Sequence, residues 1–290
     1  MTATEVLRRF NRTYTQRIGA LDESFLGLGL PLGAARLVFE IGTAGATVRD
    51  LRARLGLDSG HLARQLRRLE EDGLVVVAAD ADDRRRRTVR LTTKGRALRR
   101  RLDDRSEDLA ERLVAPLTAR QQERLTEALA TADLLVRAAT VEIRTVDPVT
   151  PGARAAMDAY FAELDRRFPH GFDPGPASTE DMSAAQGGAF VLATSEGAPV
   201  ACGGVRHLGD GVAEIKRMWV HDDWRGAGLG SRLLRHLEAV ARDLGHGLVR
   251  LDTNRTLSEA VAMYERAGYR HIERYNDNPY AQAFFEKELS

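Results

Sequence analysis

One short stretch of this chain has the residue types and the spacing to bind an anion. Arg225 opens a turn with glycine at positions 226, 228 and 230, directly after a strand-like run, residues 214–220. Glycine has no Cβ, so several backbone N–H groups at a helix N-terminus can approach one anion closely. Apolar residues then recur at helical spacing: Leu229, Leu233, Leu234, Leu237 and Val240. The stretch predicts a pyrophosphate-binding turn that opens a helix; a purely structural glycine turn is the alternative.

The glycine spacing separates this turn from two other phosphate-binding motifs. A dinucleotide fingerprint needs GxGxxG directly after the strand, and a P-loop needs GxxxxGK followed by Ser or Thr; neither string is present here. The spacing Arg-x-x-Gly-x-Gly instead resembles the acetyl-CoA signature of the GNAT superfamily of N-acetyltransferases. The resemblance implies acetyl-CoA as co-substrate and the following binding residues: Met218, Trp219, Val220, Arg225, Gly226, Ala227, Gly228, Leu229, Gly230, Asn254 and Tyr264.

The order of expected elements extends this resemblance to residues 141–289. A strand at 141–146 and a helix at 151–167 precede an antiparallel meander that ends at residue 220. After the glycine turn and its helix, we expect a strand at 248–254, a helix at 257–268 and two closing strands, at 268–275 and 283–289. This order is similar to a whole GNAT domain, which implies an α/β fold with a mixed, largely antiparallel sheet.

Two side chains carry the chemistry that the resemblance implies. In YERAGYR, Tyr264 matches a family tyrosine beside the thioester sulfur, where it would protonate the leaving thiolate; a buried structural tyrosine is the alternative. Glu214 matches a position where relatives carry a general base, acting directly or through water; an amine-orienting or structural carboxylate is equally open. The resemblance also implies that the Met218 N–H polarises the acetyl carbonyl and that Asn254 contacts pantetheine.

The acceptor site falls on segments that vary most in the family, here 168–186 and 275–282. Phe168, Phe172, Tyr275 and Tyr280 either line that site or anchor these loops.

Length and charge favour two domains. The chain has 290 residues and a formal net charge of +1, but residues 1–140 carry 26 Lys and Arg against 20 Asp and Glu, whereas residues 141–290 carry 17 against 22. A basic half suits a polyanion and an acidic half suits amines, although solubility alone explains either imbalance. We predict a domain at 1–140 and another at 141–290.

Cysteine, histidine and hydropathy exclude several classes of protein. A single cysteine, Cys202, rules out a disulfide framework and reads as a small buried residue. The seven histidines show no metal-ligand spacing, so no metal is expected. The N-terminus has arginines but no apolar signal-like region, and no run of 18 apolar residues occurs, so we expect a soluble cytoplasmic protein.

The first half carries the pattern of a helix-turn-helix. Thr47 can cap a helix that ends at Gly56, and Asp58 or Ser59 can cap a second helix whose Leu62, Leu66 and Leu69 face inward. The other face of the second helix would then present a polar set: Ser59, Gly60, His61, Arg64, Gln65 and Arg68. Such a pair predicts a DNA-reading element, with two plain solvated helices as the alternative.

A charged hairpin follows that second helix. The strands LVVVAAD and TVRLT flank the loop ADADDRRRR, and LTTKG opens the next helix. This region closely resembles the MarR family of winged-helix regulators, over roughly residues 5–140. The resemblance implies a mainly helical winged helix-turn-helix domain that binds double-stranded DNA. Its wing arginines, Arg84, Arg85 and Arg86, would reach phosphates or the minor groove, and Asp83 would orient an arginine; a solvated loop is the alternative.

Long helices at 93–115 and 118–139, with residues 3–20, would form a two-fold interface in such a protein; an intramolecular helical core is the alternative. The whole chain therefore predicts a homodimeric DNA-binding regulator fused to an acetyl-CoA-dependent N-acetyltransferase that acts on an amine. Two rivals remain: a non-catalytic acetyl-CoA sensor, and an acetyltransferase whose winged helix serves only dimerisation.

Overall fold

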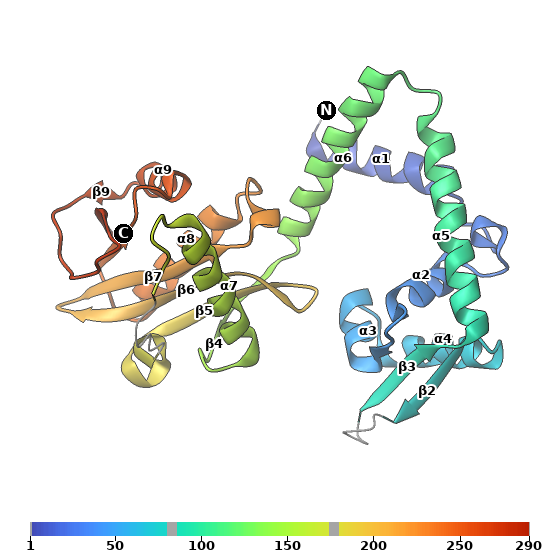
Figure 1. Cartoon of the computed structure of the whole chain (residues 1–290), viewed down its shortest axis with the longest axis horizontal. Helices are drawn as coiled ribbons and strands as arrows, with labels where there is room; N and C mark the ends of the chain where they lie inside the picture. The colour runs from blue at the N-terminus through green and yellow to red at the C-terminus, as the bar shows by residue number, and fades with distance from the viewer. Residues whose placement is uncertain (1, 80–85, 174–179, 290) are drawn as a thin grey trace. The chain divides into compact units, whose positions relative to one another are not determined.

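The computed structural model describes residues 2–79, 86–173 and 180–289, and the chain divides into two compact units, residues 1–126 and 127–290. Unit 1 is mainly helical (Figure 1). Its helices are α1 (Ala3–Arg17), α2 (Leu32–Ile41), α3 (Val48–Leu55), α4 (Ser59–Glu71), α5 (Thr93–Val114) and the first part of α6 (Ala119–Ala139). Its strands, in the order β1-β3-β2, are β1 (Ala46–Thr47), β2 (Val75–Ala79) and β3 (Arg87–Leu91).

Caps place α3 and α4 where the sequence predicts them. The Thr47 side chain accepts a hydrogen bond from the Asp50 N–H at 3.1 Å, and Asp58 accepts one from the His61 N–H at 2.8 Å, which satisfies donors at the two helix N-termini. Gly56, in the left-handed region at φ 62°, ends α3. The apolar stripe of α4 lies in the core of the unit: Leu62, Leu66 and Leu69.

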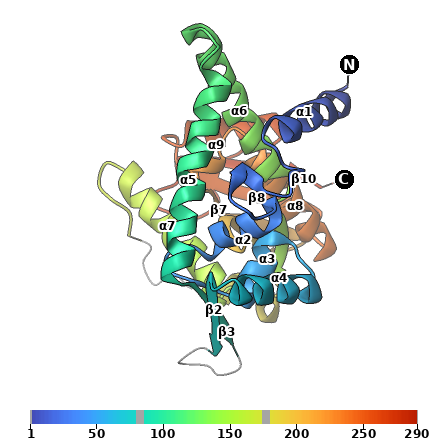
Figure 2. The ribbon, with the colours of Figure 1, turned by 90° about the vertical axis from the view of Figure 1, so that its right-hand side faces the viewer.

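The LTTKG segment joins the hairpin to the end of α4. Thr92 caps α5 and also donates to the Gly73 carbonyl at 2.7 Å, while Lys94 Nζ donates to the Asp72 carbonyl at 2.8 Å. A Cβ on Gly95 would lie 2.0 Å from the Leu74 carbonyl oxygen, so only glycine fits there. These contacts hold the β2–β3 hairpin beside α4, as both views show (Figures 1 and 2).

Unit 2 contains one seven-stranded sheet, in the order β4-β5-β6-β7-β8-β10-β9. Its strands are β4 (Glu142–Val146), β5 (Ala189–Ser195), β6 (Ala198–Gly209), β7 (Val212–Val220), β8 (Leu248–Thr253), β9 (Arg270–His271) and β10 (Ala283–Glu288). Its further helices are α7 (Pro151–Arg167), α8 (Leu229–Asp243) and α9 (Ser258–Arg266). Neighbouring strands pair antiparallel except β7 and β8, which pair parallel.

Strand periodicity divides the core of unit 2 between the two faces of this sheet. Alternate residues of β5 point to opposite sides: Val191 and Ala193 join the cluster that includes α8, and Phe190 joins the cluster that includes α7. The sheet is therefore covered on both faces, as the mixed α/β fold predicted from the sequence requires.

Two arginines attach the end of α6 to α8 and to the short turn Asp222–Trp224 before it. The Arg232 guanidinium donates to the carbonyls of Ala138, at 3.0 Å, and Val141, at 2.9 Å. The Arg137 guanidinium lies over the Trp224 ring, 4.9 Å from its centroid. Since Arg232 lies in the first turn of α8, the last turn of α6 is fixed to the start of that helix.

The predicted fold class is confirmed, but the first closing strand is much shorter than predicted. It is reduced to Arg270–His271, and the chain then forms a loop up to Gln282. The Asn276 side chain accepts from the Asn278 N–H at 3.2 Å, and Asn278 accepts from the Tyr280 N–H at 3.1 Å. Such side-chain bonds to nearby backbone compete with strand pairing.

No helix in the described part of the chain is long and apolar enough to cross a membrane.

Candidate active site and nucleic-acid interface

A gap between β7 and β8 forms the centre of unit 2. The parallel pairing runs from Val212/Leu248 to Glu214/Arg250 and ends there, although β7 continues to Val220 and β8 to Thr253. Two cavities border the strands beyond this point. The turn cavity, about 410 Å³, is lined by residues of the 225–230 turn, α8, α9 and the end of β7; the aromatic cavity, about 390 Å³, is lined by residues 215–218, 252–254, α7 and the loop before β10.

The glycine turn lies where the sequence predicts it, at the N-terminus of α8. Gly226 and Gly228 have φ of 81° and 76°, in the left-handed region where residues with a Cβ are strained, and Gly228 is the N-cap. Gly230 has an ordinary helical conformation, but its missing Cβ would lie 3.2 Å from the Met263 sulfur, on the wall of the turn cavity. The turn therefore presents the backbone donors of a helix N-terminus to this cavity.

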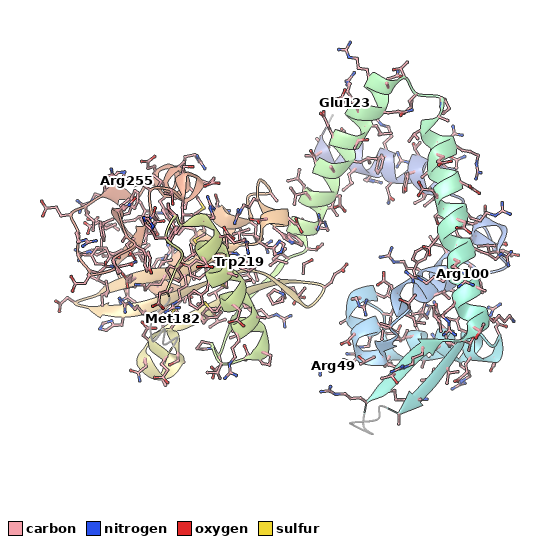
Figure 3. All side chains as sticks on the ribbon, in the orientation of Figure 1. Arg49, Arg100, Glu123, Met182, Trp219 and Arg255 are labelled. Atoms are coloured by element: carbon pink, nitrogen blue, oxygen red, sulfur yellow. The ribbon has the colours of Figure 1, made fainter. Side chains whose placement is uncertain are left out.

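One buried carboxylate holds two of the predicted binding residues. Glu163 of α7 is ion-paired with Arg225 and accepts the Trp219 indole N–H at 2.8 Å; Trp219 lies within the sheet of unit 2 (Figure 3). Arg225 also pairs with Asp222 and donates to the Val220 carbonyl at 3.2 Å. The Arg225 guanidinium thus fixes the turn to β7 and α7. Sequence reasoning missed Glu163, because it lies 62 residues from its partner.

A β-bulge interrupts the pairing of β7 with β6 beside the gap. Cys202 pairs with Trp219 and Gly204 pairs with Lys216, so β7 has one more residue than β6 between these pairs. Within the bulge, Arg217 adopts a left-handed backbone conformation with φ of 56°. A bulge disrupts the ladder locally and leaves a residue unpaired. It therefore falls at Arg217 and Met218, and Met218 is the residue whose backbone N–H is predicted to polarise the acyl carbonyl.

Tyr264 of α9 borders both cavities and is 6% exposed. Burial, with a smaller effect of the Asp252 carboxylate, raises the pKa of its phenol well above the ordinary value, so the hydroxyl stays protonated at neutral pH. Its ring contacts Tyr269 and Phe285. Tyr264 is thus a buried, protonated phenol that borders both cavities.

Glu214 lies at the closed end of the gap and is fully buried. It is ion-paired with Arg206, lies 3.5 Å from Lys216 Nζ, and accepts bonds from Tyr275 Oη at 2.7 Å and Asn276 Nδ2 at 3.1 Å. The described residues that line the two cavities do not include Glu214. Of the roles left open by the sequence, the orienting or structural carboxylate fits this environment better than a base in direct contact with an amine.

Asn254 and the predicted acceptor aromatics lie around the aromatic cavity, with one exception. Asn254 is a lining residue whose amide donates to the Tyr280 carbonyl at 2.8 Å. Phe168, Phe172 and Tyr280 also line the cavity, whereas Tyr275 turns to Glu214. Residues 174–179 of the predicted acceptor loop lie outside the described residues.

The predicted DNA-reading face of α4 is only partly exposed. Ser59, Gly60, Arg64 and Arg68 are exposed, but His61 and Gln65 are half-buried and bonded to each other at 2.6 Å. Gln65 was expected on the outward face and instead turns toward α2, because Gly33 leaves room for its amide. Gln65 is thus only partly exposed, and its contact with DNA stays a prediction.

Two exposed arginines were missed by that reading. Arg67 is exposed on α4, and its spacing of three from Arg64 is the signal that would have found it. Arg87 is exposed at the start of β3, next to the wing. Of the predicted wing residues, Arg86 is described and exposed, whereas Asp83, Arg84 and Arg85 lie outside the described residues.

No group of three or more His, Cys, Asp or Glu side chains in the described ranges is placed to hold a metal ion.

Comparison with known proteins agrees with this geometry. Residues 156–269 match the model of the acetyltransferase (GNAT) family, and residues 28–86 match that of the MarR family. The chain thus belongs to the GNAT acetyltransferase family through its second half and carries a MarR-type domain in its first half.

Individual relatives match one half or the other. The IAA acetyltransferase of Azospirillum brasilense is 32% identical over 105 residues, which are 34% of this chain and 67% of that protein. The HTH-type transcriptional regulator TtmR of Methylorubrum extorquens is 44% identical over 59 residues, 20% of this chain and 30% of that protein. An uncharacterised N-acetyltransferase of Schizosaccharomyces pombe is 34% identical over 94 residues, and the chain spans 58% of its length. A solved GNAT-family acetyltransferase from Staphylococcus aureus is 18% identical, with a TM-score of 0.46, over 52% of this chain and 100% of that one.

Proposed function

We propose that the protein transfers an acetyl group from acetyl-CoA to an amine and binds double-stranded DNA as a homodimeric regulator. The observation that carries the first activity is the meeting of three features at one gap: the helix N-terminus at Gly228, the bulge at Met218 and the protonated hydroxyl of Tyr264. We place the functional boundary near residue 140, at the end of α6.

The residues present fit acetyl-CoA. The backbone donors of the 226–230 turn suit its pyrophosphate, and the dipole of α8 favours negative charge there. The facing edges of β7 and β8 beyond Glu214 suit the two amides of the pantetheine arm, because an extended chain can pair with strand edges. Met218 borders both cavities, which suits contact between its backbone and the acetyl group.

The chemistry assigns a role to each of these groups. The amine loses a proton to water and its nitrogen attacks the thioester carbonyl, while the Met218 N–H stabilises the charge on oxygen. The C–S bond breaks, Tyr264 gives its proton to the sulfur, and the nitrogen returns a proton to Tyr264 through water. The products are an N-acetyl amide and the thiol of CoA. Glu214 acts by holding Tyr275 and Asn276 in the loop beside the site.

DNA binding is proposed on the exposed arginines of α4 and the wing. Arg64, Arg67 and Arg68 share one helix, and a winged helix places such a helix in the major groove. For dimerisation, α1 exposes Phe10 and Tyr14, whose rings stack at 5.5 Å, and Val6 one turn earlier. Their exposure within one chain favours a two-fold interface over an intramolecular helical core.

A release assay tests the enzymatic proposal. Thiol release from acetyl-CoA is measured over amines, amino acids and peptides with the full chain. We expect turnover with one class of amine; tight acetyl-CoA binding without turnover on any acceptor supports the rival reading, a sensor of acetyl-CoA.

Selection from random duplexes, followed by anisotropy titrations at several salt concentrations, tests the DNA proposal. Replacing Arg84, Arg85 and Arg86 together by alanine should weaken binding to all sequences and flatten the salt slope, because fewer counterions are released. Arg64→Ala should instead relax sequence preference, by about 1–3 kcal/mol at one base. Arg101→Ala, on α5, is the control. Weak binding without sequence preference in the parent protein supports a scaffold role.

A further inference from the structure

The aromatic cavity has the chemistry to select one class of acceptor. Its floor and side are a cluster of four rings from three separate segments: Phe161, Phe168, Phe172 and Tyr280. Phe172 and Tyr280 have centroids 4.8 Å apart, and Phe168 lies 5.7 Å from Tyr280. The Asp173 N–H donates to the Tyr280 hydroxyl at 2.9 Å, which ties the two loops together. Such a wall suits a flat or bulky apolar group.

A guanidinium borders this wall on the β7 side. Arg217 lines the cavity and lies over the Phe161 ring, 5.2 Å from its centroid. The bulge and its φ of 56° turn Arg217 away from the regular β pattern. A guanidinium group has five donors in a planar fork whose geometry matches a carboxylate. The other cation at the cavity, Lys216, lies beside Glu214.

A carboxylate faces the same cavity from β8. Asp252 accepts a bond from the Asn278 amide through Oδ2, which fixes the side chain, and a carboxylate has about four acceptor positions in all. Its negative charge helps to raise the pKa of Tyr264, the proposed proton donor, and of Tyr160. An ammonium group held by Asp252 would therefore sit near the reacting atoms.

We propose, on the basis of the proposed acetyltransferase function, that the acceptor is a free α-amino acid with an aromatic or large apolar side chain. Asp252 binds the α-ammonium group, Arg217 binds the α-carboxylate, and the ring cluster holds the side chain. The three groups of such an acceptor match three walls of one cavity, whereas a polyamine or a lysine side chain within a protein has no carboxylate for Arg217.

Matched acceptors test the proposal without any variant. L-phenylalanine, L-phenylalaninamide and phenethylamine share the ring and the amine, but only the first has the carboxylate. We expect kcat/KM for phenylalanine to exceed that for the other two at least about tenfold, since only phenylalanine can form the charge-assisted pair with Arg217. L-alanine should be poor because it leaves the ring cluster unfilled. Equal kcat/KM for phenylalanine and phenylalaninamide would overturn the proposal.

A binding measurement separates this proposal from the proposed function itself. Calorimetry of L-phenylalanine with the full chain, with CoA present, reports the acceptor site even if no acetyl transfer occurs. Arg217→Met should weaken phenylalanine binding about tenfold and leave phenethylamine unchanged, and Arg217→Lys should weaken it less. Arg144→Met, an exposed arginine of β4, is the control. Turnover on another amine, with phenylalanine binding unaffected by Arg217→Met, would overturn the acceptor class while the acetyltransferase proposal stands. Phenylalanine binding that depends on Arg217, without turnover on any amine, would overturn the acetyltransferase proposal while the assignment of the cavity to an aromatic amino acid stands.

Discussion

The hydroxyl of Tyr275 donates a 2.7 Å hydrogen bond to Oε1 of Glu214. The same carboxylate is paired with Arg206, which also reaches Asp181 at 3.1 Å. A single buried group therefore joins the loop before β10 to the segment that leads into β5. Burial raises the pKa of the Tyr275 phenol, so the phenol remains a donor to this carboxylate at all ordinary pH values.

Glu214→Gln should lower the rate of acetyl transfer by a nearly constant factor from pH 6 to pH 9. The amide cannot neutralise Arg206, so the loops lose their anchor and Tm should also fall. Rate profiles and thermal melts provide the measurement. Tyr275→Phe, which removes one donor and keeps the carboxylate, should cause a smaller loss of both. A ratio of parent to Glu214→Gln rates that grows toward low pH would instead identify Glu214 as a general base, because a protonated amine needs a base most there.

Gly230→Ala should weaken acetyl-CoA binding without lowering Tm. Position 230 has ordinary helical backbone, so alanine is tolerated, but its methyl group would push Met263 and narrow the turn cavity. Gly228→Ala is the matched comparison: with φ of 76° it should lower Tm, although no described atom beyond the two chain neighbours lies within 4 Å of the added carbon. Calorimetry and thermal melts distinguish the two effects. Unchanged affinity in Gly230→Ala would make the turn structural.

Tyr264→Phe should slow acetyl transfer by about 10²–10⁴-fold, the usual contribution of a general acid, with little change in acetyl-CoA affinity. Because the pKa of Tyr264 is raised, its ionisation should not limit the parent rate up to pH 10. Parent and variant profiles should therefore keep the same shape on the alkaline side. A rate that Tyr264→Phe leaves unchanged would assign protonation of the thiolate to another group.

Acetyl-CoA should change the affinity for selected DNA, since Arg232 fixes the start of α8 to the end of α6. Allosteric coupling is usually worth about 5–150-fold, and it must be reciprocal. DNA should therefore change the Kd of acetyl-CoA by the same factor. Arg232→Met should reduce that factor toward one while both separate affinities persist; Arg235→Met, on the exposed face of α8, is the control. Equal affinities with and without the second ligand would show two independent activities.

Stability should fall as the pH falls below about 6.5, because of His246. Burial, and then the neighbouring charge of His207, lower its pKa in the folded protein. The unfolded chain then takes up the proton first, so stability is fully present above the unfolded pKa of about 6.5 and is lost as the pH falls through the folded pKa. His246→Phe should flatten the decrease in Tm between pH 8 and pH 5, whereas His170→Phe, at an exposed site, should not. Parallel curves for parent and His246→Phe would contradict this assignment.

Elements whose signals are local could be predicted from the sequence. The helix at 151–167 has the expected bounds, and Leu62, Leu66 and Leu69 are buried as their spacing predicts. A period of 3.6 or 2 residues identifies the buried face of an element without knowledge of what packs there. The glycine turn could likewise be predicted, because the left-handed backbone conformation at Gly226 and Gly228 favours glycine.

Features that depend on distant partners could not be predicted. Glu163 is one of several acidic residues on a helix until the fold brings Arg225 and Trp219 to it. The half-buried state of Gln65 depends on the small Gly33 on another helix. The bulge at Arg217 is fixed by the register of β6 against β7, which no local pattern encodes. For the same reason the sequence does not predict that Asp252 and Arg217 line the same cavity.

The left-handed backbone of Arg217 carries a consequence for thermal stability. A residue with a Cβ in this conformation is strained by about 1–3 kcal/mol, and glycine would relieve most of that strain. Replacement of Arg217 by glycine would release that strain, but it would also remove the guanidinium that lies over the Phe161 ring. Backbone strain at this position is thus the energetic cost of keeping a cation at the wall of the proposed acceptor site.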